Sequence, residues 1–175
     1  EHYNASNRNI AKAQIMPVKN KEANIIKNNL ETLVHFLNED ISINKKTIIA
    51  LNRKILNDNN AEIRNVVNWI GSASSIPHTA NFVPPHPEYL KTNIKQFISF
   101  CNRDDIHPLV QAAFAYAYFE TIHPFVDGNG RVGRILVQLL LKEKGYLENL
   151  YVPFSIGLLK DPNEHIKALN NFRLG

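Results

Sequence analysis

The sequence predicts an all-α fold, a bundle of helices packed around one buried central helix. Apolar residues recur every three or four positions over most of the chain, which is the period of an amphipathic helix. One segment, 108–122, is apolar on nearly every side, as is typical of a helix at the centre of a domain. With 175 residues, 44% of them apolar, the chain is long enough to bury a core as a single domain.

The other helices follow from the same periodicity and from residues that start or stop a helix. Asn44 is a suitable N-cap, Pro87 stands at a first-turn position, Gly145 is a stop signal, and Asp161 with Pro162 marks a start. The segments predicted to be helical besides 108–122 are 21–39, 44–58, 87–102, 131–145 and 162–171.

Residues 70–86 are the one stretch with β character. Small and turn-forming residues surround a short Asn-Phe-Val run, and two prolines follow it. Because proline avoids central strands, we expect an irregular loop or a β-hairpin with an exposed edge. We expect the neighbouring Trp69 to be a core aromatic rather than a contact for a partner.

Composition excludes several classes of protein. The longest run without a charged residue, 109–119, is too short to span a membrane. A single cysteine rules out an internal disulfide framework and favours a reducing, cytoplasmic location.

No signal peptide is evident, and the chain opens without an initiator Met, which indicates a fragment or a numbering that omits residues. The net charge is +4, but lysine and arginine are spread along the chain, so a nucleic-acid partner is not favoured.

Residues 123–134, HPFVDGNGRVGR, interrupt two helical segments with residues that are poor in a helix interior. Asp-Gly and Asn-Gly are hairpin signals, but both flanks have helical rather than alternating period. Gly128, Gly130 and Gly133 also satisfy the dinucleotide pattern G-x-G-x-x-G, with Glu148 twenty residues on. That pattern requires a preceding strand, and here a helix precedes it, so neither interpretation is favoured.

A helix, a glycine turn and a second helix instead predict an anion site, because backbone N–H groups and the helix dipole both point at the turn. Arg131 and Arg134 lie three apart, so we expect them to share a face and clamp two phosphate groups. Asp127 can hold Mg²⁺, and His123 can exchange a proton near neutral pH. Each residue also has an ordinary structural explanation. Their coincidence within twelve residues favours phosphoryl or nucleotidyl transfer.

The stretch 123–134 resembles the signature of the Fic family, H-P-F-x-D/E-G-N-G-R-x-x-R, at every defined position. EIRNVVNWIGSAS (62–74) is similar to a segment of Fic proteins that carry an N-terminal helical extension, and 80–102 resembles the family's flap and the helix after it. The resemblance implies a Fic fold with a small β-hairpin flap, an N-terminal helical extension over 1–45 and a Fic core over 46–175.

The resemblance also implies transfer of AMP from ATP to a Ser, Thr or Tyr hydroxyl on a target protein or on the enzyme itself. His123 would be the catalytic base, Asp127 would hold Mg²⁺, and Phe125 would anchor the loop. The target would pair with the flap, and self-association into a homo-oligomer is compatible with the family. The residues implied to bind the nucleotide are Gly128, Asn129, Gly130, Arg131, Gly133 and Arg134, and those implied to form the flap are Thr79, Ala80, Asn81, Phe82 and Val83.

Alternatives stay open within and outside the family. Doc-type relatives, which transfer phosphate, lack the last Arg of the signature, so Gly130 and Arg134 favour AMP transfer; phosphocholine transfer is not excluded. Many relatives carry an inhibitory S/T-x-x-x-E-G/N motif, and the nearest match here, 5–10, has Asn9 where the Glu is expected. Because that Glu assists removal of AMP in some relatives, de-AMPylation is less favoured. The alternative that is not an enzyme is a helical interaction or DNA-binding module.

Overall fold

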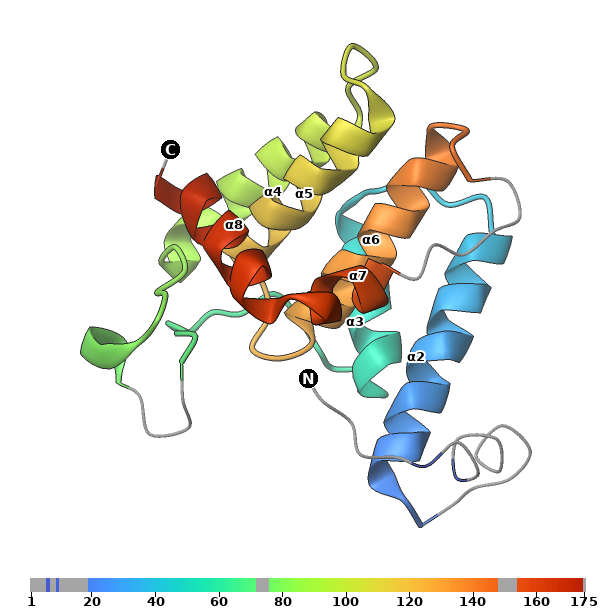
Figure 1. Cartoon of the computed structure of the whole chain (residues 1–175), viewed down its shortest axis with the longest axis horizontal. Coiled ribbons are helices and arrows are strands. Elements are labelled where there is room, and N and C mark those ends of the chain that lie inside the picture. The colour runs from blue at the N-terminus through green and yellow to red at the C-terminus, as the bar shows by residue number, and fades with distance from the viewer. Residues whose placement is uncertain (1–5, 7–8, 10–18, 72–75, 148–153, 175) are drawn as a thin grey trace.

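The structure, a computed structural model, describes residues 6, 9, 19–71, 76–147 and 154–174. Within these ranges the chain forms helices and no sheet, so the all-α prediction is confirmed (Figure 1). No helix in the described ranges is both long and apolar enough to cross a membrane. The described helices are α2 (Lys21–Asn38), α3 (Lys45–Leu56), the short 3₁₀ helix η1 (Pro77–Thr79), α4 (Pro87–Cys101), α5 (Pro108–Ile122), α6 (Asn129–Glu143), α7 (Phe154–Lys160) and α8 (Pro162–Leu174).

Local residues set the helix ends largely as predicted. The Asn44 side-chain oxygen accepts a hydrogen bond from the Thr47 N–H at 3.1 Å, which caps the start of α3. Asp161 caps α8 in the same way, accepting from the Glu164 N–H at 3.1 Å. Gly145, just after α6, has φ 71°, the left-handed conformation in which helices commonly end.

Two helices differ from the prediction. α6 begins at Asn129, two residues earlier than the predicted 131, because Gly128 adopts φ 85° and turns the chain directly into the helix. The turn between α5 and α6 is therefore shorter than the glycine pattern indicates. α7 was not predicted at all, since its seven residues are too few to show a helical period.

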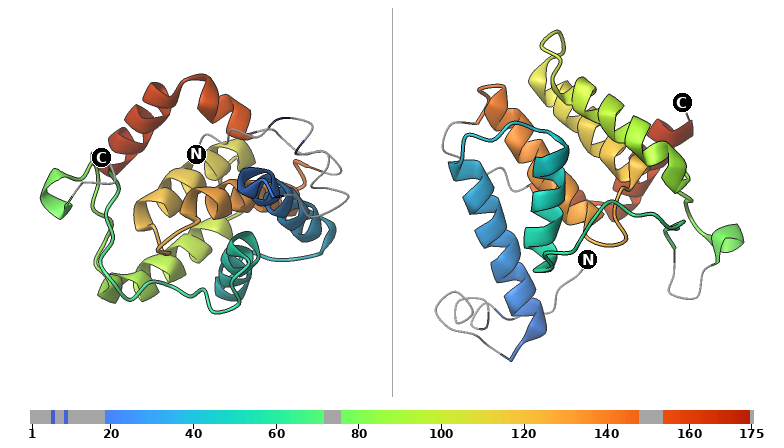
Figure 2. Two further views of the ribbon diagram at one scale, coloured as in Figure 1. Left: turned by 90° about the horizontal axis from the view of Figure 1, so that it is seen from below. Right: turned by 180° about the vertical axis from the view of Figure 1, so that it is seen from behind.

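The antiparallel pair α5 and α6 forms the centre of the molecule. α2 and α3 pack on α6, and α4 and α8 pack on α5 (Figure 1). Figure 2 shows the same arrangement from below and from behind. The buried core side chains come from α2 to α6, with Phe97, Phe119, Leu51 and Leu140 among the most completely buried, whereas α8 has no buried residue.

The predicted N-terminal extension is attached to the core by polar contacts as well as apolar ones. The Lys142 ammonium group of α6 donates hydrogen bonds to the carbonyls of Leu37 at 2.6 Å and Glu39 at 2.8 Å, at the end of α2. Such bonds satisfy carbonyl groups that a helix end leaves without partners. α2 thus packs as part of one bundle, and the boundary near residue 45 stays a prediction.

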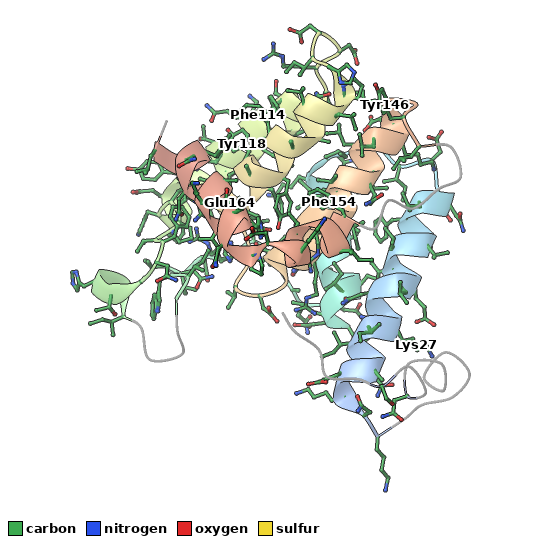
Figure 3. The ribbon with its side chains drawn as sticks, viewed as in Figure 1. Lys27, Phe114, Tyr118, Tyr146, Phe154 and Glu164 are labelled. Carbon is green, nitrogen blue, oxygen red and sulfur yellow. The ribbon has the colours of Figure 1, made fainter. Side chains whose placement is uncertain are left out.

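Two predictions of burial were wrong. α5 buries one face, but Leu109, Val110 and Phe114 on its other face are each about half exposed. Phe114 lies beside the end of α8, where its ring is 5.9 Å from that of Phe172 (Figure 3). Trp69 is 40% exposed and not a core aromatic, because the 57–71 segment crosses the surface as an irregular loop. Apolar composition marks a helix as central without saying which of its faces is covered.

Candidate active site

The candidate site is the turn that joins α5 to α6. α5 ends at His123, which adopts the left-handed conformation with φ 47° and ψ 62°, and Pro124 prevents the helix from continuing. Left-handed backbone is uncommon for a residue other than glycine and costs on the order of 1–2 kcal/mol, so surrounding contacts must hold it. The His123 N–H still donates to the Phe119 carbonyl at 2.9 Å.

Arg64 provides those contacts. Its side chain is 4% exposed, and its Nε donates to the His123 carbonyl at 2.8 Å. Its two terminal nitrogens donate to the carbonyls of Val66 at 3.0 Å and Pro85 at 2.6 Å. The Arg64 N–H donates to the Pro124 carbonyl at 2.9 Å. One guanidinium group thus joins the end of α5, the 64–66 loop and the segment that leads out of the flap.

Side chains of two asparagines hold the α5–α6 turn through hydrogen bonds to its backbone. Asn129 accepts a hydrogen bond from the Phe125 N–H at 2.9 Å and donates to the Phe125 carbonyl at 2.8 Å. Asn52 of α3 donates to the Asp127 carbonyl at 2.9 Å. Phe125 is 1% exposed, which agrees with the expected anchor. The Asn129 side chain is therefore occupied by the loop, and only its backbone remains to serve the predicted anion site.

The N-terminus of α6 opens onto this turn. The N-cap residue is Gly128, and no side chain caps the helix, whereas Asn20 and Asn44 cap α2 and α3. A Cβ on Gly128 would lie 2.8 Å from the Asn52 side-chain nitrogen, so the approach of α3 as well as the positive φ requires glycine there. An uncapped N-terminus with a glycine entry leaves N–H groups and a helix dipole directed at the turn, the arrangement that binds anions.

Asp127 projects a carboxylate from the turn, with its side chain 64% exposed. One oxygen accepts from the Gly128 N–H at 2.6 Å, and the other accepts from Arg131 at 3.1 Å. Among the described residues, no group of three or more His, Cys, Asp or Glu side chains forms a metal cage. Mg²⁺ characteristically binds through one or two carboxylates together with substrate phosphates, so a single exposed Asp127 fits that ion.

The side chains of Arg131 and Arg134 have different partners in this structure, and the clamp on two phosphate groups stays a prediction. Arg131 is 9% exposed and reaches back to Asp127. Arg134 interacts with Tyr116 and Glu120 of α5, and its terminal nitrogen lies 3.2 Å from where a Cβ on Gly130 would stand. Gly130 thus leaves room for the Arg134 guanidinium group.

Gly133 has a packing role that the glycine pattern did not reveal. A Cβ there would lie 3.0 Å from the Glu120 carboxylate and 3.3 Å from the Phe119 ring. The close approach of α5 and α6 therefore requires glycine at this position. Its predicted part in nucleotide binding stays a prediction.

Burial controls the charges beside the turn. It lowers the pKa of His123 to about 4, below the near-neutral range expected from the sequence, and the nearby cations of Arg64 and Arg173 add to the effect. The imidazole is therefore uncharged at neutral pH. Burial raises the pKa of the Glu120 carboxyl to about 7, against the opposing attraction of Arg134 and Arg173. His123 Nδ1 lies 3.8 Å from a Glu120 oxygen and faces this buried side, so Nε2 is the nitrogen left for a substrate.

Among the described residues of the flap, which leave out 72–75, one pair of residues makes antiparallel backbone contacts. Ile70 and Phe82 form an isolated antiparallel bridge, with N–H to carbonyl distances of 2.8 and 3.2 Å. η1, which ends at Thr79, projects from the bundle (Figure 1). Arg173 of α8 lies over the Phe82 ring, 3.7 Å from its centre, which is a cation–π contact. Of the five predicted flap residues, Phe82 is the one that joins the flap to the site.

Four residues near the site carry no predicted role: Asn52, Arg64, Glu120 and Arg173. Arg64 stands in the 62–74 segment whose resemblance pointed to the family, and that is the available signal for it. Asn52 and Arg173 reach the turn from distant parts of the chain, whereas Glu120 stands three residues before His123 on α5. Of the segment 5–10, the structure describes Ser6 and Asn9, where the Asn9 N–H donates to the Ser6 carbonyl at 2.9 Å. The rest of that segment lies outside the described residues, and the absence of the inhibitory Glu stays a prediction.

Comparison with known proteins agrees with this architecture. The model of the Fic/DOC family matches residues 42–141, more than half of the chain. The chain therefore belongs to the Fic/DOC family. It is 32% identical over 115 residues to the protein adenylyltransferase Fic of Drosophila grimshawi, covering 62% of this chain and 22% of that protein. It is 33% identical over 72 residues to the protein adenylyltransferase fic-1 of Caenorhabditis elegans, covering 39% of this chain and 14% of that protein.

Solved structures share the fold. A Fic family protein from Desulfovibrio desulfuricans G20 superposes with a TM-score of 0.74 at 20% identity, over 96% of this chain and 52% of that one. Residues 134–508 of Fic-1 from C. elegans superpose with a TM-score of 0.67 at 22% identity, over 98% of this chain and 52% of that one. The chain thus spans about half the length of these solved chains and about a fifth of the Drosophila relative.

Proposed function

We propose that this chain transfers AMP from ATP to a hydroxyl side chain of a protein. The observation that supports this most directly is the position of an uncharged, buried His123 beside the uncapped N-terminus of α6. A proton acceptor next to an anion site is the minimum that nucleotidyl transfer to a hydroxyl requires. The names of the relatives, protein adenylyltransferases at about one-third identity, point to the same reaction.

In the proposed step the target hydroxyl oxygen attacks the α-phosphorus of ATP. A new P–O bond forms, the bond to the β-phosphate oxygen breaks, and pyrophosphate leaves. The hydroxyl proton passes to His123 Nε2, which is able to accept it because the imidazole is neutral. Arg64 keeps the imidazole in place by holding the His123 carbonyl.

The N-terminus of α6 would bind the phosphate oxygens through backbone N–H groups of the first turn, with Arg131 and Arg134 nearby for the outer phosphates. That role requires Arg131 to exchange its contact with Asp127 for a phosphate contact. Asp127 would hold Mg²⁺, which when bound offsets phosphate charge. The target chain would lie along the flap beside Phe82 and Val83, where Val83 is 44% exposed.

The test uses ATP labelled at the α-phosphate, a parallel sample labelled at the γ-phosphate, and Mg²⁺, with a cell lysate as a source of targets. We expect label on protein from α-labelled ATP only. It should be lost in His123→Ala and kept in His35→Ala, a matched control on the exposed face of α2. Transfer from γ-labelled ATP only would replace AMP transfer with phosphate transfer. Failure to bind ATP at all in equilibrium dialysis would favour an interaction module.

A further inference from the structure

A groove separate from the candidate active site is lined by residues of α3 and α4. These two helices contact each other. Its volume is about 460 Å³, within the range of about 300–1,000 Å³ that ligand sites occupy. None of the residues of the α5–α6 turn lines it. The groove therefore needs an explanation of its own.

The floor of the groove is apolar and belongs mainly to α4. Leu90, Ile94 and Ile98 follow each other at intervals of four residues and form one stripe along the helix. Ile63 and Pro87 complete the apolar lining. Leu90 and Ile94 are 1% and 4% exposed and form the bottom of the groove, so the partly exposed Ile63 and Ile98 offer most of its apolar surface to a segment laid along α4.

Lysines stand on both sides of that floor. Lys91 and Lys95 are one turn apart on α4, and Lys45 lies opposite at the start of α3, where the helix dipole adds positive potential. All three are exposed, and within the described part of the chain none of them has an ion-pair partner. The lining residues include no Asp or Glu. The groove thus combines an apolar floor with positive rims.

We propose that this groove docks an acidic amphipathic segment of a partner protein. Carboxylates flanking an apolar stripe would meet the lysines on both rims, while the apolar side chains fill the floor. A fatty acid fits less well, because it offers one carboxylate to three separated ammonium groups. A second copy of this chain would need to present an acidic apolar face of its own.

The position of the groove suits a partner that must be held near the flap. Ile63 and Pro87, which both line it, flank the stretch 64–86 that carries the flap. Ile63 directly precedes Arg64. Arg64 donates to the carbonyl of Pro85, which lies two residues before Pro87. A bound segment would therefore contact both ends of the flap-bearing stretch. The proposal itself concerns binding and does not depend on AMP transfer.

The test measures binding of a panel of fluorescein-labelled amphipathic peptides by fluorescence anisotropy. Each peptide has leucines at positions i, i+3, i+4 and i+7, with glutamates on both flanks and the spacing between flanks varied. A matched panel carries lysine in place of glutamate. We expect saturable binding of at least one acidic peptide and none of the basic ones. The Lys91→Glu/Lys95→Glu variant should weaken that binding by about tenfold or more.

The control variant Lys54→Glu/Lys160→Glu changes the net charge equally at two exposed helical lysines outside the groove, and it should weaken binding by less than about twofold. Because all four lysines are exposed, both variants should keep the thermal unfolding midpoint of the parent. Isoleucine methyl NMR locates the site directly. Ile63 and Ile98 should shift on binding, and the exposed Ile166 of α8 should not.

Three results would overturn the proposal. The first is the absence of binding by every acidic peptide up to about 1 mM, which corresponds to about 4 kcal/mol of binding free energy. The second is equal loss of binding in the groove and control variants. The third is assignment of the groove to a different occupant. Either displacement of the peptide by a long-chain fatty acid at equimolar concentration or self-association of the protein through Ile63 and Ile98 would show this.

Discussion

Replacing Arg64 with alanine should destabilise the fold more than any other single change of a charged residue near the site. The guanidinium group makes hydrogen bonds of 2.8, 3.0 and 2.6 Å to the carbonyls of His123, Val66 and Pro85. A longer one of 3.4 Å reaches Ile122. Because the side chain is 4% exposed, water replaces these bonds poorly when the group is removed.

The expected loss of unfolding free energy is about 3 kcal/mol. Each of the three short bonds contributes about 1–1.5 kcal/mol net, and removing the cation recovers part of its desolvation cost, which is what lowers the pKa of Arg64. Arg64→Lys should lose about half as much, since an ammonium group keeps the charge but cannot reach carbonyls on three segments at once. A domain with a stability of about 5–15 kcal/mol remains folded after either change.

Urea unfolding followed by circular dichroism measures both variants against a matched control. Arg53→Ala removes a partly exposed arginine that pairs with Glu62 and donates to the Ala61 carbonyl, and it should cost less than about 1 kcal/mol. Equal losses in Arg64→Ala and Arg53→Ala would refute the reasoning. An Arg64→Lys variant as stable as the parent would also refute it, because the ability of one guanidinium group to donate to several carbonyls would then contribute nothing to stability.

Three further outcomes follow from burial near the central helices. The carboxyl of Glu120 has a pKa of about 7 in the folded protein, above its ordinary value of 4.5. Between these pH values the unfolded chain releases this proton while the folded protein keeps it, so the free energy of unfolding falls as pH rises. Glu120→Gln should therefore match the parent near pH 4 and exceed its unfolding free energy by about 3 kcal/mol at pH 8; a difference that does not vary with pH would contradict this. Gly133→Ala should cost about 1–3 kcal/mol by chemical denaturation, because its methyl group meets Glu120 and Phe119, whereas Gly157→Ala, with open space around it, should be neutral or stabilising. Burial raises the pKa of the Cys101 thiol to about 12, so the native protein should resist iodoacetamide at pH 8 and react once unfolded; rapid native labelling would show that the 1% exposed side chain is accessible after all.

The sequence by itself determined most helices and pointed to the turn that carries the candidate site. Helix starts depend on neighbours a few residues away, such as Asn44 on Thr47 and Asp161 on Glu164, so they are visible in a short window of the chain. The signature 123–134 is also local, and it led to the Fic family that residues 42–141 match. Such features were predicted because the interacting groups are close in the chain.

The tertiary structure decided which groups meet across long separations. Arg64 binds the carbonyl of His123, 59 residues away, and Asn52 binds that of Asp127, 75 residues away. Gly133 faces Glu120 because two helices cross there, and the outer face of α5 stays exposed despite its apolar residues. The groove between α3 and α4 likewise joins Lys45 to Lys91 and Lys95. No local pattern encodes these pairs, since they depend on how packing of the whole core positions one helix against another.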